Sequence, residues 1–176
     1  MAARGSAARE VLQTLLVALV LALVIRAFVV ESFVVDGVSM EPALHDGERL
    51  LVDKLTYRWR APQRFDIVVF RYPLDPKRDF VKRVIGLPGE TVEIREGRVY
   101  VDGRMLAEPY IEERAPDFYP PVTVPPGHVF VLGDNRPHSD DSRSGWTVPI
   151  RDIIGRAWFV YWPPAEIGLV PHPQGP

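Results

Sequence analysis

The apolar residues divide the chain into one long segment near the N-terminus and a larger region of short apolar bursts. From residue 11 to residue 30, 17 of 20 residues are apolar, and the exceptions are Gln13, Thr14 and Arg26. Twenty helical residues span about 30 Å, the thickness of the hydrocarbon core of a bilayer. This run lacks the polar face that a helix at the surface of a protein core has. The pattern predicts a transmembrane helix over residues 11–30.

Charges around this run predict its orientation. Arg4 and Arg9 precede it, so the positive-inside rule places residues 1–10 in the cytoplasm and the chain after Glu31 outside. A cleaved signal peptide has the same basic start and apolar middle, but it needs small residues at positions −3 and −1 of its cleavage site. The run leads instead into Phe28, Val29 and Val30, so we expect a retained single-span anchor in the cell membrane, in contact with lipid.

After the anchor, the pattern changes to that of a mostly β protein. Apolar or alternating segments are separated by turns rich in Gly and Pro, at 67–70, 80–85, 91–94, 98–101, 129–132 and 157–162. Short strands joined by such turns predict antiparallel sheets or a barrel-like domain. We expect this domain over 31–165, with a hairpin and loop excursion at about 95–126 and a weakly structured tail at 166–176.

Composition and motifs narrow the chemistry. The chain has no cysteine, which excludes disulfides, thiol nucleophiles and thiolate metal sites. Its formal net charge of −2 argues against a nucleic-acid partner bound by bulk phosphate neutralisation. The chain has neither of the glycine-rich phosphate-binding motifs Gly-x-x-x-x-Gly-Lys-Ser/Thr and Gly-x-Gly-x-x-Gly. It also lacks the Gly-x-Ser-x-Gly motif of many hydrolases. We expect no cofactor.

Three segments are unusual for a purely structural β domain. Ser39 lies two residues after a glycine, just beyond the predicted anchor, Lys82 and Arg83 interrupt an apolar strand, and residues 132–143 form a dense polar loop. Successive strand residues face opposite ways, so one of the two cations must point toward the apolar side. If Lys82 is that residue, burial lowers its pKa. Each segment also has an ordinary explanation: a turn, an exposed edge, or loop capping.

The polar loop also allows a metal-site interpretation. Its candidate ligands are Asp134, His138, Asp140 and Asp141. Arginines lie among them, and the four histidines of the chain show no zinc-ligand spacing. We therefore predict no metal site.

Considered together and in order, these motifs resemble those of bacterial type I signal peptidases. The matching segments are Asp-Gly-Val-Ser-Met-Glu-Pro at 36–42, Asp-Ile-Val-Val-Phe at 66–70, Val-Lys-Arg-Val-Ile-Gly-Leu-Pro-Gly-Glu at 81–90, Gly-Asp-Asn-Arg at 133–136 and Ser-Asp-Asp-Ser-Arg at 139–143. The resemblance runs from the anchor to about Trp162 and is to the short, single-span branch of the family.

The resemblance implies a membrane-bound serine endopeptidase that removes signal peptides from exported preproteins. A single anchor gives no reason to expect more than a monomer. It implies Ser39 as nucleophile and Lys82 as general base, with the Ser39 backbone N–H as an oxyanion donor. The matching supporting residues are Ser139, which orients the lysine, and Asp141, Arg143 and Asp134, which brace the site. The long branch has a second, serine donor at the place of Gly37, so that donor stays unassigned here. Met40 would pack beneath the substrate strand.

Two rival interpretations share some of these features. Self-cleaving repressors of the Ser/Lys type have a similar serine motif, but they are cytoplasmic and carry a DNA-binding domain where this chain has its apolar run. A non-catalytic relative is expected to have lost Ser39 or Lys82, and both are present. Three aromatic residues, Tyr57, Trp59 and Trp146, belong either to the core or to a surface that meets the bilayer.

Overall fold

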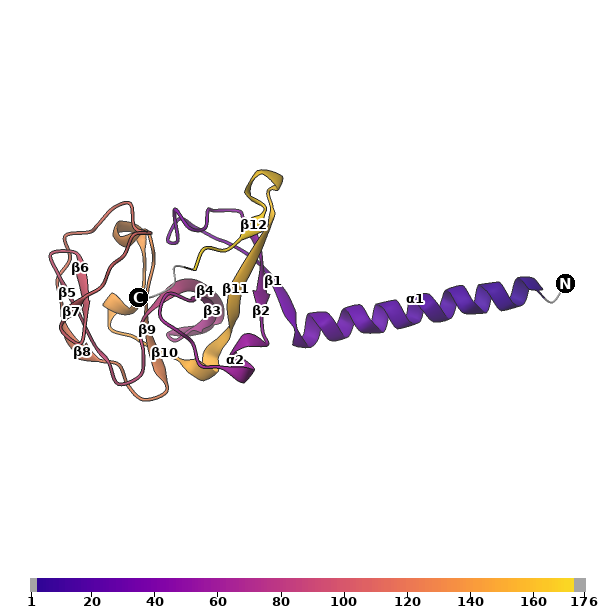
Figure 1. The fold of residues 1–176 in the computed structure, drawn as a ribbon, viewed down its shortest axis with the longest axis horizontal. Helices are drawn as coiled ribbons and strands as arrows, with labels where there is room; N and C mark the ends of the chain where they lie inside the picture. The colour runs from indigo at the N-terminus through magenta and orange to yellow at the C-terminus, as the bar shows by residue number, and fades with distance from the viewer. Residues whose placement is uncertain (1–2, 173–176) are drawn as a thin grey trace.

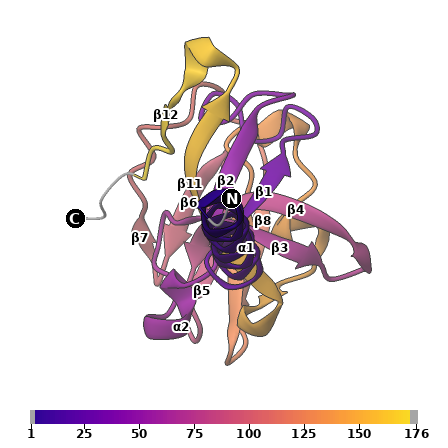
Figure 2. The ribbon, with the colours of Figure 1, turned by 90° about the vertical axis from the view of Figure 1, so that its right-hand side faces the viewer.

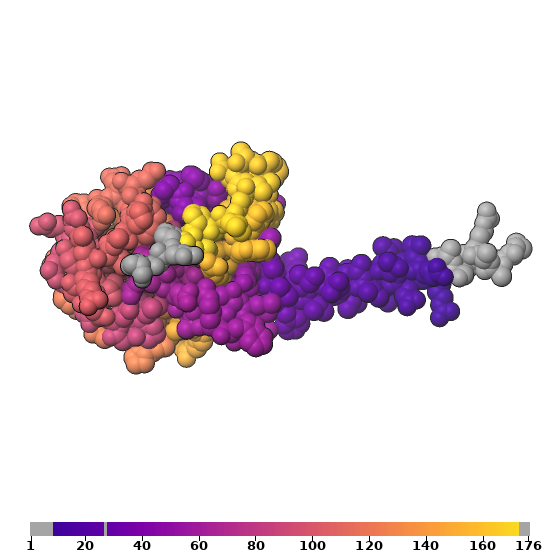
Figure 3. All heavy atoms as spheres, in the orientation of Figure 1, coloured from indigo at the N-terminus to yellow at the C-terminus, as the bar shows by residue number. Residues whose placement is uncertain are grey.

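The computed structural model describes residues 3–172, and of residues 3–8 and 27 it describes the backbone alone. The side chain of Arg4, on which the predicted orientation partly depends, lies outside the described residues, as do residues 173–176. Figure 1 shows one helix that stands clear of a body made mainly of strands, and Figure 3 shows the same N-terminal segment projecting from the body. The predicted mostly β, antiparallel fold is confirmed.

The projecting helix is α1, Ala3–Phe28. Its large apolar side chains between Val11 and Ile25 are 44–69% exposed. In the part of the chain that the structure describes, no helix has both the length and the apolar character that crossing a membrane requires.

Most of the body is one antiparallel sheet of eight strands in the order β1-β2-β11-β3-β4-β9-β10, with β12 paired to β11. Its strands are β1 Val30–Val34, β2 Arg49–Asp53, β3 Ile67–Tyr72, β4 Asp75–Gly86, β9 His128–Leu132, β10 Val148–Pro149, β11 Ile153–Trp162 and β12 Gly168–Leu169. Figure 2, viewed along α1, shows β1, β2 and β11 behind the end of the helix. Because β1 is the first strand in this order and pairs with β2 alone, its other edge is free among the described residues.

A second sheet of four strands, in the order β7-β6-β5-β8, packs at the far end of the body (Figure 1). Its strands are β5 Thr91–Arg95, β6 Arg98–Val101, β7 Arg104–Met105 and β8 Tyr119–Thr123. Both of its tight turns have consecutive residues with positive φ, Glu96-Gly97 and Asp102-Gly103, as two-residue hairpin turns require. The excursion predicted at about 95–126 therefore contains, besides the expected hairpin, two further strands of this sheet, β7 and β8.

The hairpin of β3 and β4 brings the long strand β4 into the body. Its first residues, Asp75 to Asp79, are mainly exposed, whereas its last five, from Lys82, are buried. Phe80 to Arg83 pair with β3, and Arg83 also pairs with Leu132 of β9. Lys82 therefore lies where β4 passes from the rim of the body into its core.

Short helices complete the body: α2 Thr56–Trp59, and the 3-10 helices η1 Arg136–His138, η2 Ser142–Ser144, η3 Ile150–Asp152 and η4 Pro164–Glu166. Within the described part of the predicted tail, residues 166–172, the chain is more ordered than the sequence predicts. The strand β12 pairs with β11, and Val170 is 3% exposed. The pattern gave no signal of this because β12 is only two residues long and lies in a proline-rich stretch.

The sequence leaves open whether Tyr57, Trp59 and Trp146 lie in the core or at a surface that meets the bilayer. One of them, Trp59, lies at the surface. Trp59 is 87% exposed, whereas Trp146 is 6% exposed and packs against Phe70 and Tyr72. Tyr57 is partly buried and donates a hydrogen bond to Asp66 Oδ2 at 3.0 Å. Trp146 is therefore a core residue.

Candidate active site

Ser39 lies in the loop that joins β1 to β2. Gly37, two residues earlier, has φ +89°, a conformation that side chains disfavour, and its N–H donates to Asp46 Oδ1 at 2.7 Å. Directly after Ser39, Met40 is fully buried, and its carbonyl accepts a hydrogen bond from Leu44 N–H at 3.0 Å. These contacts fix the loop on both sides of the serine, which is itself only half-buried.

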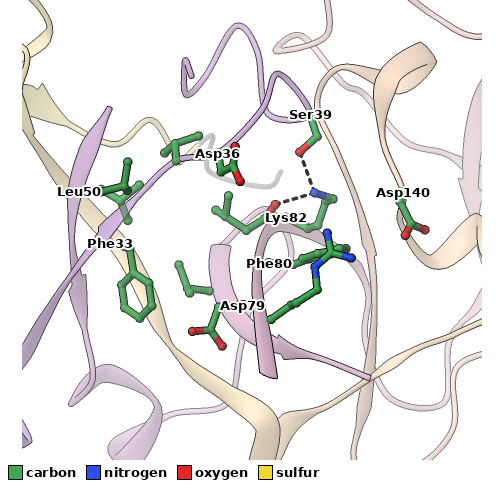
Figure 4. A pocket seen from close by; sticks show the side chains of 13 residues that line it. Phe33, Asp36, Ser39, Leu50, Asp79, Phe80, Lys82 and Asp140 are labelled. Carbon is green, nitrogen blue, oxygen red and sulfur yellow. Dashed lines mark hydrogen bonds between the residues drawn. The ribbon is translucent and has the colours of Figure 1, made fainter. Parts of the chain in front are cut away.

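Lys82 reaches this serine from β4. Its Nζ donates to Ser39 Oγ at 2.7 Å and to the Val81 carbonyl at 2.9 Å, as Figure 4 shows. The side chain is 4% exposed, and Nζ lies 5.2 Å from the centre of the Phe80 ring. The contact brings together two groups that are 43 residues apart in the sequence.

Burial lowers the pKa of Lys82 from its ordinary value of 10.5 to about 8, while the charges of Asp141, Asp140 and Asp134 oppose the shift. Removing water from an ammonium group disfavours its charged form. With a pKa of about 8, about one molecule in ten carries a neutral Lys82 at pH 7. An ordinary lysine would be neutral in fewer than about one molecule in a thousand.

Asp141 and Arg143 form a brace behind the site. Arg143 donates from Nε to Asp141 Oδ1 and from Nη2 to Oδ2, both at 2.8 Å. Asp141 is fully buried and also accepts from Gly133 N–H at 3.1 Å. Arg143 extends the brace to Asp117 and to the Arg136 carbonyl. The carboxylate of Asp141 is therefore paired with an arginine and not with Lys82.

Asp134 is held on the opposite face of β4. Arg83 donates from Nε to Asp134 Oδ1 at 2.8 Å and from Nη2 to Oδ2 at 2.5 Å, and both side chains are fully buried. The two neighbouring cations of β4 are thus both buried, so neither lies at an exposed edge. Asp134 therefore binds the strand that carries Lys82 through Arg83. Among the described residues it makes no hydrogen bond to Lys82 itself.

Ser139 packs beneath the Ser39 loop. Its hydroxyl is buried and has no hydrogen-bond partner among the described residues, Lys82 included. A Cβ atom added to Gly133 would lie 2.2 Å from Ser139 Oγ and 2.5 Å from the Ser39 carbonyl, so only glycine allows this close approach. The predicted orienting contact to the lysine is therefore absent from this arrangement.

Sequence reasoning missed one residue that holds the serine. The backbone N–H of Asn135 donates to the Ser39 carbonyl at 3.1 Å, and its side-chain amide donates to the Val38 carbonyl at 3.1 Å. The Gly-Asp-Asn-Arg segment signals a polar loop, but no sequence pattern shows that it contacts the loop of Ser39. Asn135 fixes the backbone on which the serine stands.

A pocket of about 390 Å³ opens beside Ser39 and Lys82. Figure 4 shows Phe33 and Leu50 on one side of it and Asp79 and Phe80 on another. Its walls come mainly from the end of β1 and from Arg78 to Lys82 of β4. The pocket is therefore bordered by two strands and has the serine at its rim.

The polar-loop residues considered as metal ligands have other partners. Asp140 accepts hydrogen bonds from Tyr72 OH at 3.1 Å and Ser144 Oγ at 2.9 Å. His138 contacts Asn135 Oδ1 at 3.2 Å, while Asp134 and Asp141 pair with arginines. These four side chains do not converge on a common point.

Comparisons with known proteins agree on one family. Residues 8–162 match the family described as signal peptidase, peptidase S26. A probable signal peptidase I-1 of Synechocystis sp. is 45% identical over 91% of this chain and 85% of its own length. The signal peptidase I of Bacillus licheniformis is 41% identical over 90% of each chain. That of Mycobacterium tuberculosis is 36% identical over 96% of this chain and 77% of its own.

A crystal structure of a signal peptidase I from Enterococcus faecalis is 38% identical, covers 55% of this chain and 97% of its own, and superposes with a TM-score of 0.49. The family match and the three relatives cover nearly all of the chain, and they confirm the resemblance on which the sequence analysis relied. The chain belongs to the signal peptidase family, peptidase S26, and is a peptidase that removes signal peptides from preproteins.

Proposed function

We propose that the enzyme cleaves its substrates with Ser39 as nucleophile and Lys82 as general base. The observation that carries this proposal is the 2.7 Å hydrogen bond between Ser39 Oγ and a lysine that is 4% exposed. A serine hydroxyl is a weak nucleophile until a neighbouring base takes its proton. Burial lowers the pKa of Lys82 to about 8, so a useful fraction is neutral near physiological pH.

The proton then moves in a closed cycle. Neutral Lys82 accepts the proton of Ser39 Oγ as the oxygen attacks the scissile carbonyl, and the resulting ammonium gives a proton to the departing amine. Lys82 then takes a proton from the water that attacks the acyl-enzyme and returns it to Ser39 Oγ as the bond between Oγ and the acyl carbon breaks. The Val81 carbonyl, 2.9 Å from Nζ, orients the amine throughout. Both groups belong to one chain, so we propose that the monomer is active.

The Ser39 backbone N–H is the proposed oxyanion donor. It makes no hydrogen bond to another group within the described residues, so it is available to a substrate oxygen. Asn135 supports it by holding the neighbouring carbonyls of Val38 and Ser39. Asp141, Arg143 and Asp134 act as positioning residues, and Ser139 contributes by packing beneath the serine rather than by a bond to the lysine.

We propose that the signal peptide binds as an extended strand in the pocket between β1 and β4. The free edge of β1 offers backbone groups to such a strand, as in other cases of strand addition. The pocket beside it, walled by Phe33, Leu50 and Phe80, would take small apolar side chains next to the scissile bond.

The decisive experiment is cleavage of a preprotein with an Ala-x-Ala site by the purified chain. We expect the mature protein, with the N-terminus directly after the second alanine, from the wild type and none from Ser39→Ala. Intact mass spectrometry reads the cleaved bond, and circular dichroism checks that the variant is folded. Full activity of folded Ser39→Ala would reject the proposal.

We also propose that residues 11–30 anchor the enzyme in the cell membrane, with residues 1–10 in the cytoplasm and the catalytic body outside. The support is the apolar sequence run and the exposure of its side chains on α1. We expect the protein to stay with membranes after carbonate extraction, and protease added to spheroplasts to digest the body. Release by carbonate would reject the anchor, and a body protected until lysis would reverse the orientation.

A further inference from the structure

Three potential metal ligands from distant parts of the sequence converge away from the Ser39–Lys82 pair. His45 and Glu48 end the loop that carries Ser39, whereas Glu166 belongs to η4, between β11 and β12. One ligand atom of each lies within 4.8 Å of the other two. Figures 1 and 2 show the loop and the C-terminal hairpin side by side at one end of the body.

Glu48 is the unusual member of this cluster. It is 4% exposed, and its Oε1 lies 3.3 Å from His45 Nδ1. Its other oxygen, Oε2, is buried and has no hydrogen-bond partner among the described residues. Within the same residues, neither Glu48 nor Glu166 is paired with a lysine or an arginine. A buried carboxylate with an unpaired oxygen is costly, and binding a cation would lower that cost.

We propose that His45, Glu48 and Glu166 bind a divalent transition-metal ion, with Zn²⁺ as the representative ion. Two carboxylates and one imidazole balance the charge of such an ion, and a water molecule would complete a tetrahedral set. Metal–ligand bonds of about 2.1 Å place the ligands of a tetrahedral site about 3.4 Å apart. The 3.3 Å separation of His45 Nδ1 and Glu48 Oε1 matches this spacing, and the ligand atom of the exposed Glu166, within 4.8 Å of theirs, would have to move closer to bind the ion. The imidazole favours Zn²⁺ over Ca²⁺ or Mg²⁺.

The ion would join the Ser39 loop to the C-terminal hairpin. The Glu48 carbonyl accepts from Val35 N–H at 2.8 Å, and Asp46 accepts from Gly37 N–H at 2.7 Å, so the metal-binding end of the loop is tied to its beginning. The site therefore stabilises the loop on which the serine stands. It takes no part in the proton transfers, and its existence is independent of the proposed roles of Ser39 and Lys82.

The test is Zn²⁺ binding to the full-length protein in detergent, prepared without a histidine tag and stripped with EDTA that is then removed. Isothermal titration should give saturable binding at one site per chain. We expect binding to weaken by at least about tenfold in His45→Ala and in Glu166→Gln, both at exposed positions. Glu113→Gln, an exposed glutamate outside the cluster, should bind like the wild type.

Thermal unfolding gives a second measurement. At free Zn²⁺ about 100-fold above Kd, Tm of the wild type should rise by about 5–10 °C, and that of Glu166→Gln should not. The Zn²⁺-dependent rise in Tm should also be absent in Glu48→Gln. Three results would each overturn the proposal. The first is no saturable Zn²⁺ binding, the second is Zn²⁺ binding by His45→Ala and Glu166→Gln that equals that of the wild type, and the third is Ca²⁺ binding as tight as Zn²⁺ binding.

Discussion

The two faces of β4 bury neighbouring cations in opposite ways. On one face, Arg83 forms two hydrogen bonds with Asp134, and its guanidinium lies 4.2 Å from the centre of the Tyr110 ring. On the other, Lys82 contacts a hydroxyl and a carbonyl and has no ion-pair partner in the described part of the chain. Arg83 has an opposite charge within hydrogen-bond distance, whereas Lys82 has none, so no ion pair offsets the desolvation that lowers the pKa of Lys82.

Nearby carboxylates oppose the lowering of the pKa of Lys82. The charges of Asp141, Asp140 and Asp134 raise that pKa, and two of these residues, Asp134 and Asp141, are paired with Arg83 and Arg143 respectively. Desolvation by burial outweighs the three carboxylates, so the pKa stays at about 8.

The largest expected effect is that of Lys82→Arg. This variant keeps a buried cation near Ser39, but a guanidinium has a pKa above about 12 and cannot act as a base. We expect kcat/KM to fall by about 10²–10⁴-fold or more, to the level of Ser39→Ala. The assay is preprotein cleavage, with Tm as the control for folding. An active Lys82→Arg enzyme would show that the charge, and not proton transfer, is what the lysine supplies.

On the other face of β4, the expected loss is one of stability. Asp134→Asn removes one partner of a fully buried ion pair and leaves Arg83 without its counter-charge. We expect the free energy of unfolding to fall by about 3–5 kcal/mol, measured by urea denaturation. Asp117→Asn, which weakens the more exposed pair with Arg143, is the matched control and should cost about 1 kcal/mol or less. Equal losses in the two variants would remove the contrast between buried and exposed pairs.

Much of this arrangement could be predicted from local sequence, whereas two of the features that could not be predicted join distant segments. The strands, the hairpin turns and the burial of a cation in β4 follow from alternation and turn residues that are close in the chain. The contacts of Asn135 with Val38 and of Glu166 with the Ser39 loop join segments about a hundred residues apart. No pattern within one segment encodes such contacts. The roles of Ser39, Lys82 and Ser139 came from family resemblance, because a lone serine or lysine has no distinctive local signal.

A smaller effect is expected on the pH dependence of the rate. The base must be neutral to act, and the pKa of Lys82 is lowered to about 8. The value of kcat/KM should therefore rise with pH through an apparent pKa of about 8, as measured by initial rates on one preprotein. A rising limb near the ordinary lysine pKa of 10.5 would contradict a desolvated base.

The same shift predicts a change in stability with pH. Between pH 8 and 10.5 the unfolded chain binds more protons at Lys82 than the folded chain does, so raising the pH stabilises the fold. Lys82→Met removes this dependence. The free energy of unfolding of Lys82→Met minus that of the wild type should therefore fall by about 3 kcal/mol between pH 8 and pH 10.5. A constant difference between the two proteins would mean that Lys82 titrates alike in both states.

The smallest expected effect separates the reacting pair from the proposed metal site. In the proposed mechanism, the proton passes directly between Ser39 and Lys82, which hydrogen-bond to each other, and the mechanism requires neither a histidine nor a metal ion. Treatment with EDTA should leave kcat/KM unchanged at a temperature well below Tm, while it lowers Tm if the His45 site held an ion. His128→Ala, His138→Ala and His172→Ala should each stay within about tenfold of the parent rate, as should His45→Ala, since loss of a general base costs about 10²–10⁴. Activity that EDTA abolishes and a divalent ion restores, in protein shown to remain folded, would place a metal in the reaction and reject the Ser39–Lys82 mechanism.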